Sequence, residues 1–165
     1  MTPTYILDMA HKVMGGIDLD PASSADANVN VRAAQYLERD GLSQPWCGRV
    51  WLNPPGGCLN PKTMLPAKTG ISSAAVWWTK LVGAHALGSV TEALFLAFTL
   101  ELFRTGQRFC EPPQAFPFCV PEDRIKFPSS CGKNVNQPAA ASAIVYLGPN
   151  VQRFREVFGR LGYCT

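Results

Sequence analysis

The stretch Val50–Gly57, Val-Trp-Leu-Asn-Pro-Pro-Gly-Gly, decides how the rest of this chain is interpreted. Its three apolar residues predict a short buried strand, and an amide, two prolines and two glycines follow without a spacer. Prolines fix φ near −65° and donate no N–H, while glycines allow a steep turn or a close approach to a ligand. Because open α/β sheets bind ligands at the carboxyl ends of their strands, the stretch indicates either a functional site or an ordinary strand-ending turn.

Length and composition indicate a single compact domain that spans residues 1–165. The chain is 47% hydrophobic and only 16% charged, and its net charge of +3 permits a polyanionic partner without requiring one. Its six cysteines contain no Cys-x-x-Cys pair, which argues against a zinc site and predicts reduced thiols and no metal. No leader opens the chain and no apolar run approaches the length of a membrane span, so we expect a cytoplasmic protein with no membrane partner.

Hydrophobic spacing predicts helices that alternate with strands. The first helix, over residues 6–14, is expected to be capped by Thr2 and to have Pro3 at its first position. The other expected elements are helices at 73–88 and 151–161 and strands at 17–20, 50–52, 93–103, 120–127 and 140–147, with loops at 28–38, 59–73 and 129–138. The segment 93–103 can continue into a helix or turn, and 28–38 can hold a short strand or helix. This alternation predicts an α/β fold with a mostly parallel sheet, in which the last two strands can form an antiparallel pair.

Three stretches place polar groups at the ends of predicted strands or turns. They are Asp18-Leu19-Asp20-Pro21-Ala22-Ser23, then Asp40-Gly41-Leu42, then Asn53-Pro54-Pro55. An Asp-x-Asp pair can indicate a calcium loop, but Ala22 and Ser23 stand where such a loop needs an oxygen ligand and a glycine. The first stretch instead predicts that Asp20 presents a carboxylate above a tight turn. Asp20 as a turn or helix-cap acid, and Asp40-Gly41 as an ordinary turn pair, are the competing interpretations.

In this order, and together with Thr2-Pro3, Trp46-x-Gly48 and Arg124-Ile125-Lys126-Phe127, these stretches resemble the phage-type (Dam-like) DNA N6-adenine methyltransferases. The resemblance covers most of the chain. It implies a Rossmann-like, S-adenosylmethionine-dependent methyltransferase fold of reduced size, with S-adenosylmethionine as cofactor and DNA as partner. It also implies a phage or prophage protein that acts in a bacterial host cell.

The resemblance implies a role for each stretch. The implied cofactor-binding residues are Thr2, Pro3, Asp20, Pro21, Ala22, Ser23, Asp40 and Asn53, with Asp20 at the amino-acid end and Asp40 at the adenine end. The implied catalytic turn is Asn53, Pro54 and Pro55. The exocyclic amine of adenine is a poor nucleophile because its lone pair is delocalised into the ring, and the carbonyls of the Asn53 side chain and of Pro54 would accept its N–H groups. Removing one preorganised dipole of this kind typically costs about 10²–10³ in rate.

Gly56 departs from the family pattern, in which this position commonly carries an aromatic ring that stacks on the flipped base. Such stacking contributes about 1–3 kcal/mol per base, so another ring has to replace it. The candidates are Trp51, Trp77, Trp78 and Phe127, although Trp77 and Trp78 are equally expected as core residues of their helix.

Candidate DNA contacts are basic side chains in the segments 59–73 and 104–138, which we expect to face the substrate. They are Lys62, Lys68, Arg124, Lys126 and Lys133. The loop lysines are equally consistent with ordinary solvated charges. Two further functions stay open: methyl transfer to another amino acceptor (cytosine N4, an RNA base or a protein glutamine), and a non-catalytic module that binds nucleic acid or cofactor.

Overall fold

The computed structural model describes residues 1–109, 111–127 and 141–165, and a seven-stranded sheet forms its centre. The strand order is β10-β8-β9-β7-β3-β1-β2. The strands are β1 (Leu19–Asp20), β2 (Gln35–Tyr36), β3 (Gly48–Leu52), β7 (Val90–Ala97), β8 (Phe118–Pro121), β9 (Ala143–Leu147) and β10 (Gly162–Cys164).

The sheet is mostly parallel, as predicted. The neighbours β2, β1, β3 and β7 are parallel, whereas β9 is antiparallel to both β7 and β8, and β10 is antiparallel to β8. Only β9 and β10 of the seven strands therefore oppose the rest. The α/β class and the antiparallel pairing of the strands near 120 and 145 are confirmed, and β10 is an addition.

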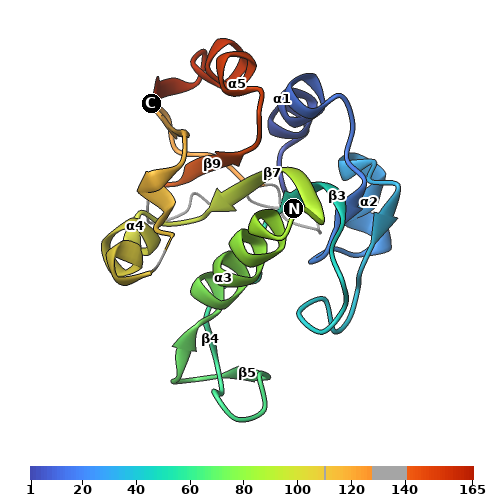
Figure 1. Ribbon diagram of the computed structural model, residues 1–165, viewed down its shortest axis with the longest axis vertical. Helices are drawn as coiled ribbons and strands as arrows, with labels where there is room; N and C mark the ends of the chain where they lie inside the picture. Colours follow the sequence, from blue (N-terminus) through green and yellow to red (C-terminus); the bar gives the residue numbers. More distant parts are fainter. Residues whose placement is uncertain (110, 128–140) are drawn as a thin grey trace.

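Helices cover both faces of the sheet. They are α1 (Thr4–Met14), α2 (Ala25–Val31), α3 (Ser73–Ala86), α4 (Glu101–Thr105) and α5 (Val151–Phe158). Two 3-10 helices follow α4, at Gly106–Arg108 and Pro113–Ala115. Figure 1 shows α1 and α5 on one side of the sheet and α3 on the other. Side chains alternate along β3, so that Trp51 packs under α1 and α5 while Val50 and Leu52 pack under α3.

The start of the chain differs from the prediction in two respects, because Pro3 precedes the first helical residue, Thr4, instead of occupying that position, and Thr2 does not cap the helix. Pro3, not Thr2, is the N-cap residue of α1, and no side chain caps this helix. The Thr2 side chain is buried and its hydroxyl accepts a hydrogen bond from Asn53 Nδ2 at 3.0 Å. The prediction that Thr2 caps the helix is therefore wrong, because its hydroxyl is engaged at the end of β3 instead.

The segment after β1 is more regular than the loop predicted for 28–38. Helix α2 begins at Ala25, where the side chain of Ser24 accepts a hydrogen bond from Ala27 N–H. The helix ends at Val31, its C-cap residue Arg32 has a left-handed φ of 56°, and β2 follows. The apolar residues of α2 give no clear helical pattern, because Val29 is exposed while Val31 is buried.

The predicted loop 59–73 is instead a small three-stranded antiparallel sheet, here called the arm (residues 57–72). Its strands are β4 (Cys58–Leu59), β5 (Pro66–Ala67) and β6 (Ile71–Ser72), in the order β5-β4-β6. Strands of two residues are too short to show a hydrophobic period, which explains the wrong prediction. Most side chains of the arm are exposed, as expected.

The strand predicted at 120–127 is also wrong in its second half. Strand β8 ends at Pro121, and Arg124 and Lys126 lie outside any strand with exposed side chains. The alternating pattern arises because Ile125 is buried in the core that α1 covers, and the segment forms no more than an isolated bridge at Phe127. The loop predicted at 129–138, and Lys133 within it, lie outside the described residues.

Within 1–109, 111–127 and 141–165, no helix is long and apolar enough to cross a membrane. In the same ranges, no group of three or more His, Cys, Asp or Glu side chains is placed to hold a metal ion.

Candidate functional site

The site lies where the chain reverses its progress across the sheet. From β1 the chain moves to β2 on one side, then returns to β3 on the other side of β1. Ligands of open α/β sheets bind at such a switch point, beyond the carboxyl ends of the strands. A pocket of about 540 Å³, the main pocket, lies there, and its size suits a small-molecule ligand. Its lining residues are Met1, Pro21, Ala22, Ser23, Leu37, Glu38, Arg39, Asp40, Gly41, Asn53, Pro54, Pro55, Trp77, Phe98 and Phe127.

Asp20 ends β1 as a buried carboxyl group that is 3% exposed. Its Oδ1 accepts a hydrogen bond from Ala22 N–H at 3.2 Å, across a turn that Pro21 preorganises. Burial raises the pKa of Asp20 to about 6, although the N–H of Ala22 and the nearby Ser23 hydroxyl oppose this shift. No lysine or arginine of the described ranges forms an ion pair with Asp20. A buried carboxylate of this kind favours a cationic ligand.

Asp18, two residues earlier, has a structural partner. Its carboxylate pairs with Arg49 of β3 at 2.7 Å and also accepts a hydrogen bond from Arg49 N–H. The hydrogen bonds from Arg49 hold the pKa of Asp18 below its usual value. Of the two acids in Asp18-Leu19-Asp20, only Asp20 is therefore available to a ligand.

Unpartnered polar atoms gather in a side chamber of about 120 Å³ that adjoins the main pocket. Among the described residues, Trp51 Nε1 and Asn53 Oδ1 are buried and make no hydrogen bond, and both residues line this chamber together with Asp20 and Ser23. Leaving one such atom unpaired typically costs about 1–3 kcal/mol. Their concentration in one place indicates that a polar ligand completes the site.

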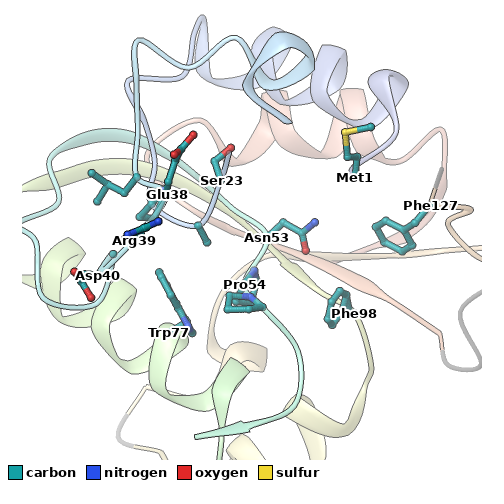
Figure 2. Close-up of a pocket in the computed structure, with 15 residues that line it drawn as sticks. Met1, Ser23, Glu38, Arg39, Asp40, Asn53, Pro54, Trp77, Phe98 and Phe127 are labelled. Atoms are coloured by element: carbon teal, nitrogen blue, oxygen red, sulfur yellow. The ribbon is translucent and has the colours of Figure 1, made fainter. Parts of the chain in front are cut away.

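Asn53 is held in one orientation at the end of β3. Its Nδ2 donates to the Thr2 hydroxyl, so its Oδ1 is the atom that remains as a free acceptor. The residue lines both the main pocket and the side chamber. Figure 2 shows Asn53 and Pro54 at the middle of the main pocket.

The Asp40–Gly41 turn forms one end of the main pocket and packs too closely for any side chain at position 41. A Cβ atom there would lie 2.0 Å from the Pro21 carbonyl oxygen and 2.8 Å from the ring of Trp77. Asp40 itself adopts a left-handed φ of 55°, with its side chain exposed. This turn thereby holds the Asp40 carboxylate beside Trp77 (Figure 2).

The segment that follows this turn is fastened to α3. Trp46 donates its Nε1–H to the Gly41 carbonyl at 2.8 Å and stacks on Trp77 with ring centroids 5.6 Å apart. Lys80 Nζ donates to the carbonyls of Leu42 and Gln44 and lies 4.9 Å from the centroid of the Trp46 ring. Burial lowers the pKa of Lys80. Trp77 therefore has a packing partner on one side and the pocket on the other.

The opposite end of the main pocket is aromatic. Phe98 and Phe127 contact each other edge to face, with centroids 6.1 Å apart and ring planes at 90°. Figure 2 places this pair on the far side of Asn53 and Pro54 from Asp40 and Trp77. A Cβ atom at Gly56 would lie 3.4 Å from the Phe98 ring, so Phe98 occupies the space next to the missing side chain.

The structure brings most of the predicted site residues together. The main pocket is lined by Pro21, Ala22, Ser23, Asp40, Asn53, Pro54, Pro55 and Trp77, and the side chamber adds Thr2 and Asp20. Pro3 begins α1 next to Thr2, and Gly56 lies beside Phe98, but neither lines a cavity described here. The predicted substrate contacts outside the main pocket are Trp78, Lys62, Lys68, Arg124 and Lys126.

The four candidate stacking rings separate clearly. Trp51 and Trp78 are fully buried in the core, and Trp78 donates its Nε1–H to the Glu111 carbonyl at 2.8 Å. Trp77 lines the main pocket at its Asp40 end and Phe127 lines it at the opposite, Phe98 end. Sequence reasoning missed Phe98, whose signal was its place directly after the apolar run that forms β7.

No family model, curated protein or solved structure matches the chain. The functional interpretation therefore depends on the geometry of the two cavities and on the order of the three polar stretches along the chain.

Proposed function

We propose that the chain transfers a methyl group from S-adenosylmethionine to the exocyclic N6 amine of an adenine flipped out of DNA. The observation that supports this most is the orientation of Asn53. Its Nδ2 is held by Thr2, and its Oδ1 is a buried acceptor without a partner among the described residues, at the wall of a pocket of ligand size. A fixed acceptor of this kind suits an amine N–H.

The residues of the side chamber and of the Asp40 end of the main pocket fit the proposed cofactor. Asp20 is a buried carboxyl group without a basic partner in the described ranges, which suits a positively charged ammonium or sulfonium group. The unpartnered Trp51 Nε1–H suits a carboxylate. Asp40 at the pocket rim suits hydroxyl or amine donors. When bound, S-adenosylmethionine supplies an electrophilic methyl group.

The chain's own residues would orient the acceptor amine. Asn53 Oδ1 and the Pro54 carbonyl accept its N–H groups, which keeps electron density on the nitrogen as its bond to the methyl group forms. Because Asn53 is already held by Thr2, little reorganisation is needed at the moment of reaction. Phe98 and Phe127 provide apolar ring surface for a planar base at the same end of the pocket.

Basic side chains near the site support a DNA substrate. Arg39 lines the main pocket, and Lys126 directly precedes Phe127 with its side chain exposed. Lys62 and Lys68 are exposed on the arm, which begins two residues after Pro55. Together with the net charge of +3, this placement favours a polyanion over a neutral substrate.

The test is transfer of a labelled methyl group from S-adenosylmethionine to unmethylated DNA of mixed sequence. We expect label in adenine, and we expect Asn53→Ala to lower the transfer rate by about 10²–10³ while retaining cofactor affinity in calorimetry. Gln152→Ala, an exposed amide change on α5, is the matched control and should retain full activity. Label found in cytosine N4, in RNA or in protein instead of adenine would show that the methyl acceptor is not DNA adenine. If the protein binds the cofactor and transfers no methyl group, the proposed function is refuted.

A further inference from the structure

The arm stands apart from the rest of the molecule. It begins directly after the Asn53-Pro54-Pro55 turn, and Ser73 N–H donates to the Gly57 carbonyl at 3.0 Å, which closes its base at the start of α3. Figure 1 shows β4 and β5 projecting beyond the end of α3, away from the central sheet. Both ends of the arm therefore adjoin elements that line the main pocket, through Pro55 and Trp77.

The tip of the arm is an ordered turn. Asn60 Oδ1 accepts hydrogen bonds from the N–H groups of Lys62 at 2.8 Å and Thr63 at 3.3 Å. The Asn60 carbonyl accepts from Met64 N–H at 2.8 Å, and Asn60 N–H donates to the Leu65 carbonyl at 2.9 Å. This network holds Met64 at a φ of 57°, which non-glycine residues adopt at a cost.

This ordered turn presents apolar side chains to solvent. Leu65 is 63% exposed and Met64 39% exposed, at the point where the arm reverses direction. Neither Met64 nor Leu65 belongs to or packs against the two core clusters of the described residues, although Met64 has a left-handed φ. This combination of exposed apolar side chains and a left-handed φ indicates that the tip is preorganised for a partner.

The charge around the tip favours a negatively charged partner. Lys62 and Lys68 are both exposed on the arm, and the sequence contains no Asp or Glu from Gly41 to Thr91. An apolar tip flanked by lysines, with no acid nearby in the sequence, is complementary to nucleic acid, where phosphates surround stacked bases.

We propose that the arm binds duplex DNA, with Leu65 and Met64 inserting into the base stack and Lys62 and Lys68 contacting phosphates. This proposal rests on the proposed function, because insertion next to the pocket would help to extrude a base from a duplex. Extruding a base requires that it be unstacked from its neighbours, and apolar side chains that DNA-bending proteins insert between base pairs promote this unstacking. A single strand has no continuous stack to open, so the apolar tip should matter only for duplex substrates.

The first experiment compares the same unmethylated plasmid fragments in native and heat-denatured form. For the Met64→Ser, Leu65→Ser double variant we expect the transfer rate to native DNA to fall by about 10–100-fold, and the rate to denatured DNA to stay within about twofold of the unmodified protein. Leu87→Ser is the matched control, because Leu87 is 87% exposed at the far end of α3, and it should change neither rate. Equal rates for the double variant and the unmodified protein on native DNA would overturn the wedge.

The second experiment needs no catalysis. Binding of a labelled duplex is followed by fluorescence anisotropy over a series of salt concentrations. For the Lys62→Gln, Lys68→Gln double variant we expect the slope of log affinity against log salt to become shallower by about 1.8, which corresponds to two phosphate contacts. Arg160→Gln, an exposed change next to α5, should leave the slope unchanged.

The two experiments separate this proposal from the proposed function. A shallower salt slope without any methyl transfer would retain the arm as a DNA-binding element and refute the function. The proposal that the arm binds DNA would be refuted if both arm variants transferred methyl groups to native DNA at the normal rate and showed an unchanged salt slope. Light scattering that shows a dimer dissociated by Leu65→Ser would also refute it, because the tip would then bind a second copy of the chain.

Discussion

At the scale of single residues, the hydrogen bond between Asn53 and Thr2 determines which atom of the amide faces the pocket. The Thr2 hydroxyl occupies Nδ2, so the carbonyl oxygen is left for a ligand. Thr2 is itself buried and is separated from Asn53 by 51 positions in the chain. Its proposed role is therefore that of a positioning residue.

The first prediction is that Thr2→Val lowers kcat about 10–100-fold and changes the KM for S-adenosylmethionine little, because the amide loses its orientation but not its chemistry. Thr2→Ser keeps the hydroxyl and should restore the rate. Steady-state kinetics on both variants provide the measurement. A Thr2→Val variant with unchanged kcat would show that the hydrogen bond does not position Asn53.

Asp20 gives a prediction that depends on pH. Burial raises its folded-state pKa from 3.8 to about 6, so the folded state binds the proton more tightly than the unfolded state. The stability that this proton contributes is complete below pH 3.8 and is lost as the pH rises through 6. The buried, charged carboxylate therefore weakens the ligand-free protein at neutral pH.

We predict that Asp20→Asn raises the free energy of unfolding at pH 7.5 by up to about 3 kcal/mol, the equivalent of the pKa shift from 3.8 to about 6, and has little effect near pH 4. Urea unfolding at both pH values measures this, with the exposed acid change Glu122→Gln as control. The same variant should lose cofactor binding. If Asp20→Asn is destabilising at pH 7.5, the carboxylate has a stabilising partner and the cation-binding interpretation fails.

At the scale of elements, the Asp40–Gly41 turn depends on a close contact between two loops and a helix. We predict that Gly41→Ala destabilises the protein by about 1–3 kcal/mol and weakens cofactor binding, because its Cβ would lie 2.0 Å from the Pro21 carbonyl oxygen. Gly83→Ala in α3 is the matched control. A Cβ at position 83 meets nothing within 4 Å, so this change should stabilise the helix by about 0.5–1 kcal/mol.

Urea denaturation and calorimetric titration with S-adenosylmethionine measure both glycine variants. A Gly41→Ala protein as stable as the unmodified chain would mean that the turn can move away from Pro21 without cost.

Elements with a long apolar pattern could be predicted, and short ones could not. The spacing of apolar residues along the chain was enough to predict four elements, which are helices α1 and α3 and strands β7 and β9. The two-residue strands of the arm have no period to detect, and their pairing depends on contacts across the fold. Likewise, the spacing of adjacent residues on a helix separates Trp77 from Trp78, but only the packing of α3 decides that Trp77 faces the pocket.

At the scale of the whole molecule, the strand order explains why distant polar residues meet. Asp20 is the last residue of β1 and Asn53 directly follows β3, which is adjacent and parallel to β1, while Asp40 follows β2 on the other side of β1. The alternation of strands and helices predicted a mostly parallel sheet. The alternation did not predict the strand order, because the order depends on whether each new strand pairs with one edge of the growing sheet or with the other.

Two residues of the site lie outside the three polar stretches, and their contacts could not be predicted from sequence either. Thr2 and Phe98 come from the start of the chain and the end of β7, and neither lies in a pattern that names its partner. Their roles depend on packing between parts of the chain that are far apart in sequence, 51 positions for Thr2 and Asn53. The identity of the polar stretches could be predicted from sequence, whereas the hydrogen bond to Asn53 and the aromatic wall could not.

The most direct test of the central claim is nucleoside analysis by mass spectrometry of unmethylated DNA incubated with the protein and S-adenosylmethionine labelled in its methyl group. The account predicts labelled N6-methyladenine with the unmodified protein and a rate of its formation about 10²–10³ lower with Asn53→Ala. Its contradiction would be DNA without any labelled N6-methyladenine, at protein concentrations where calorimetry shows the cofactor bound.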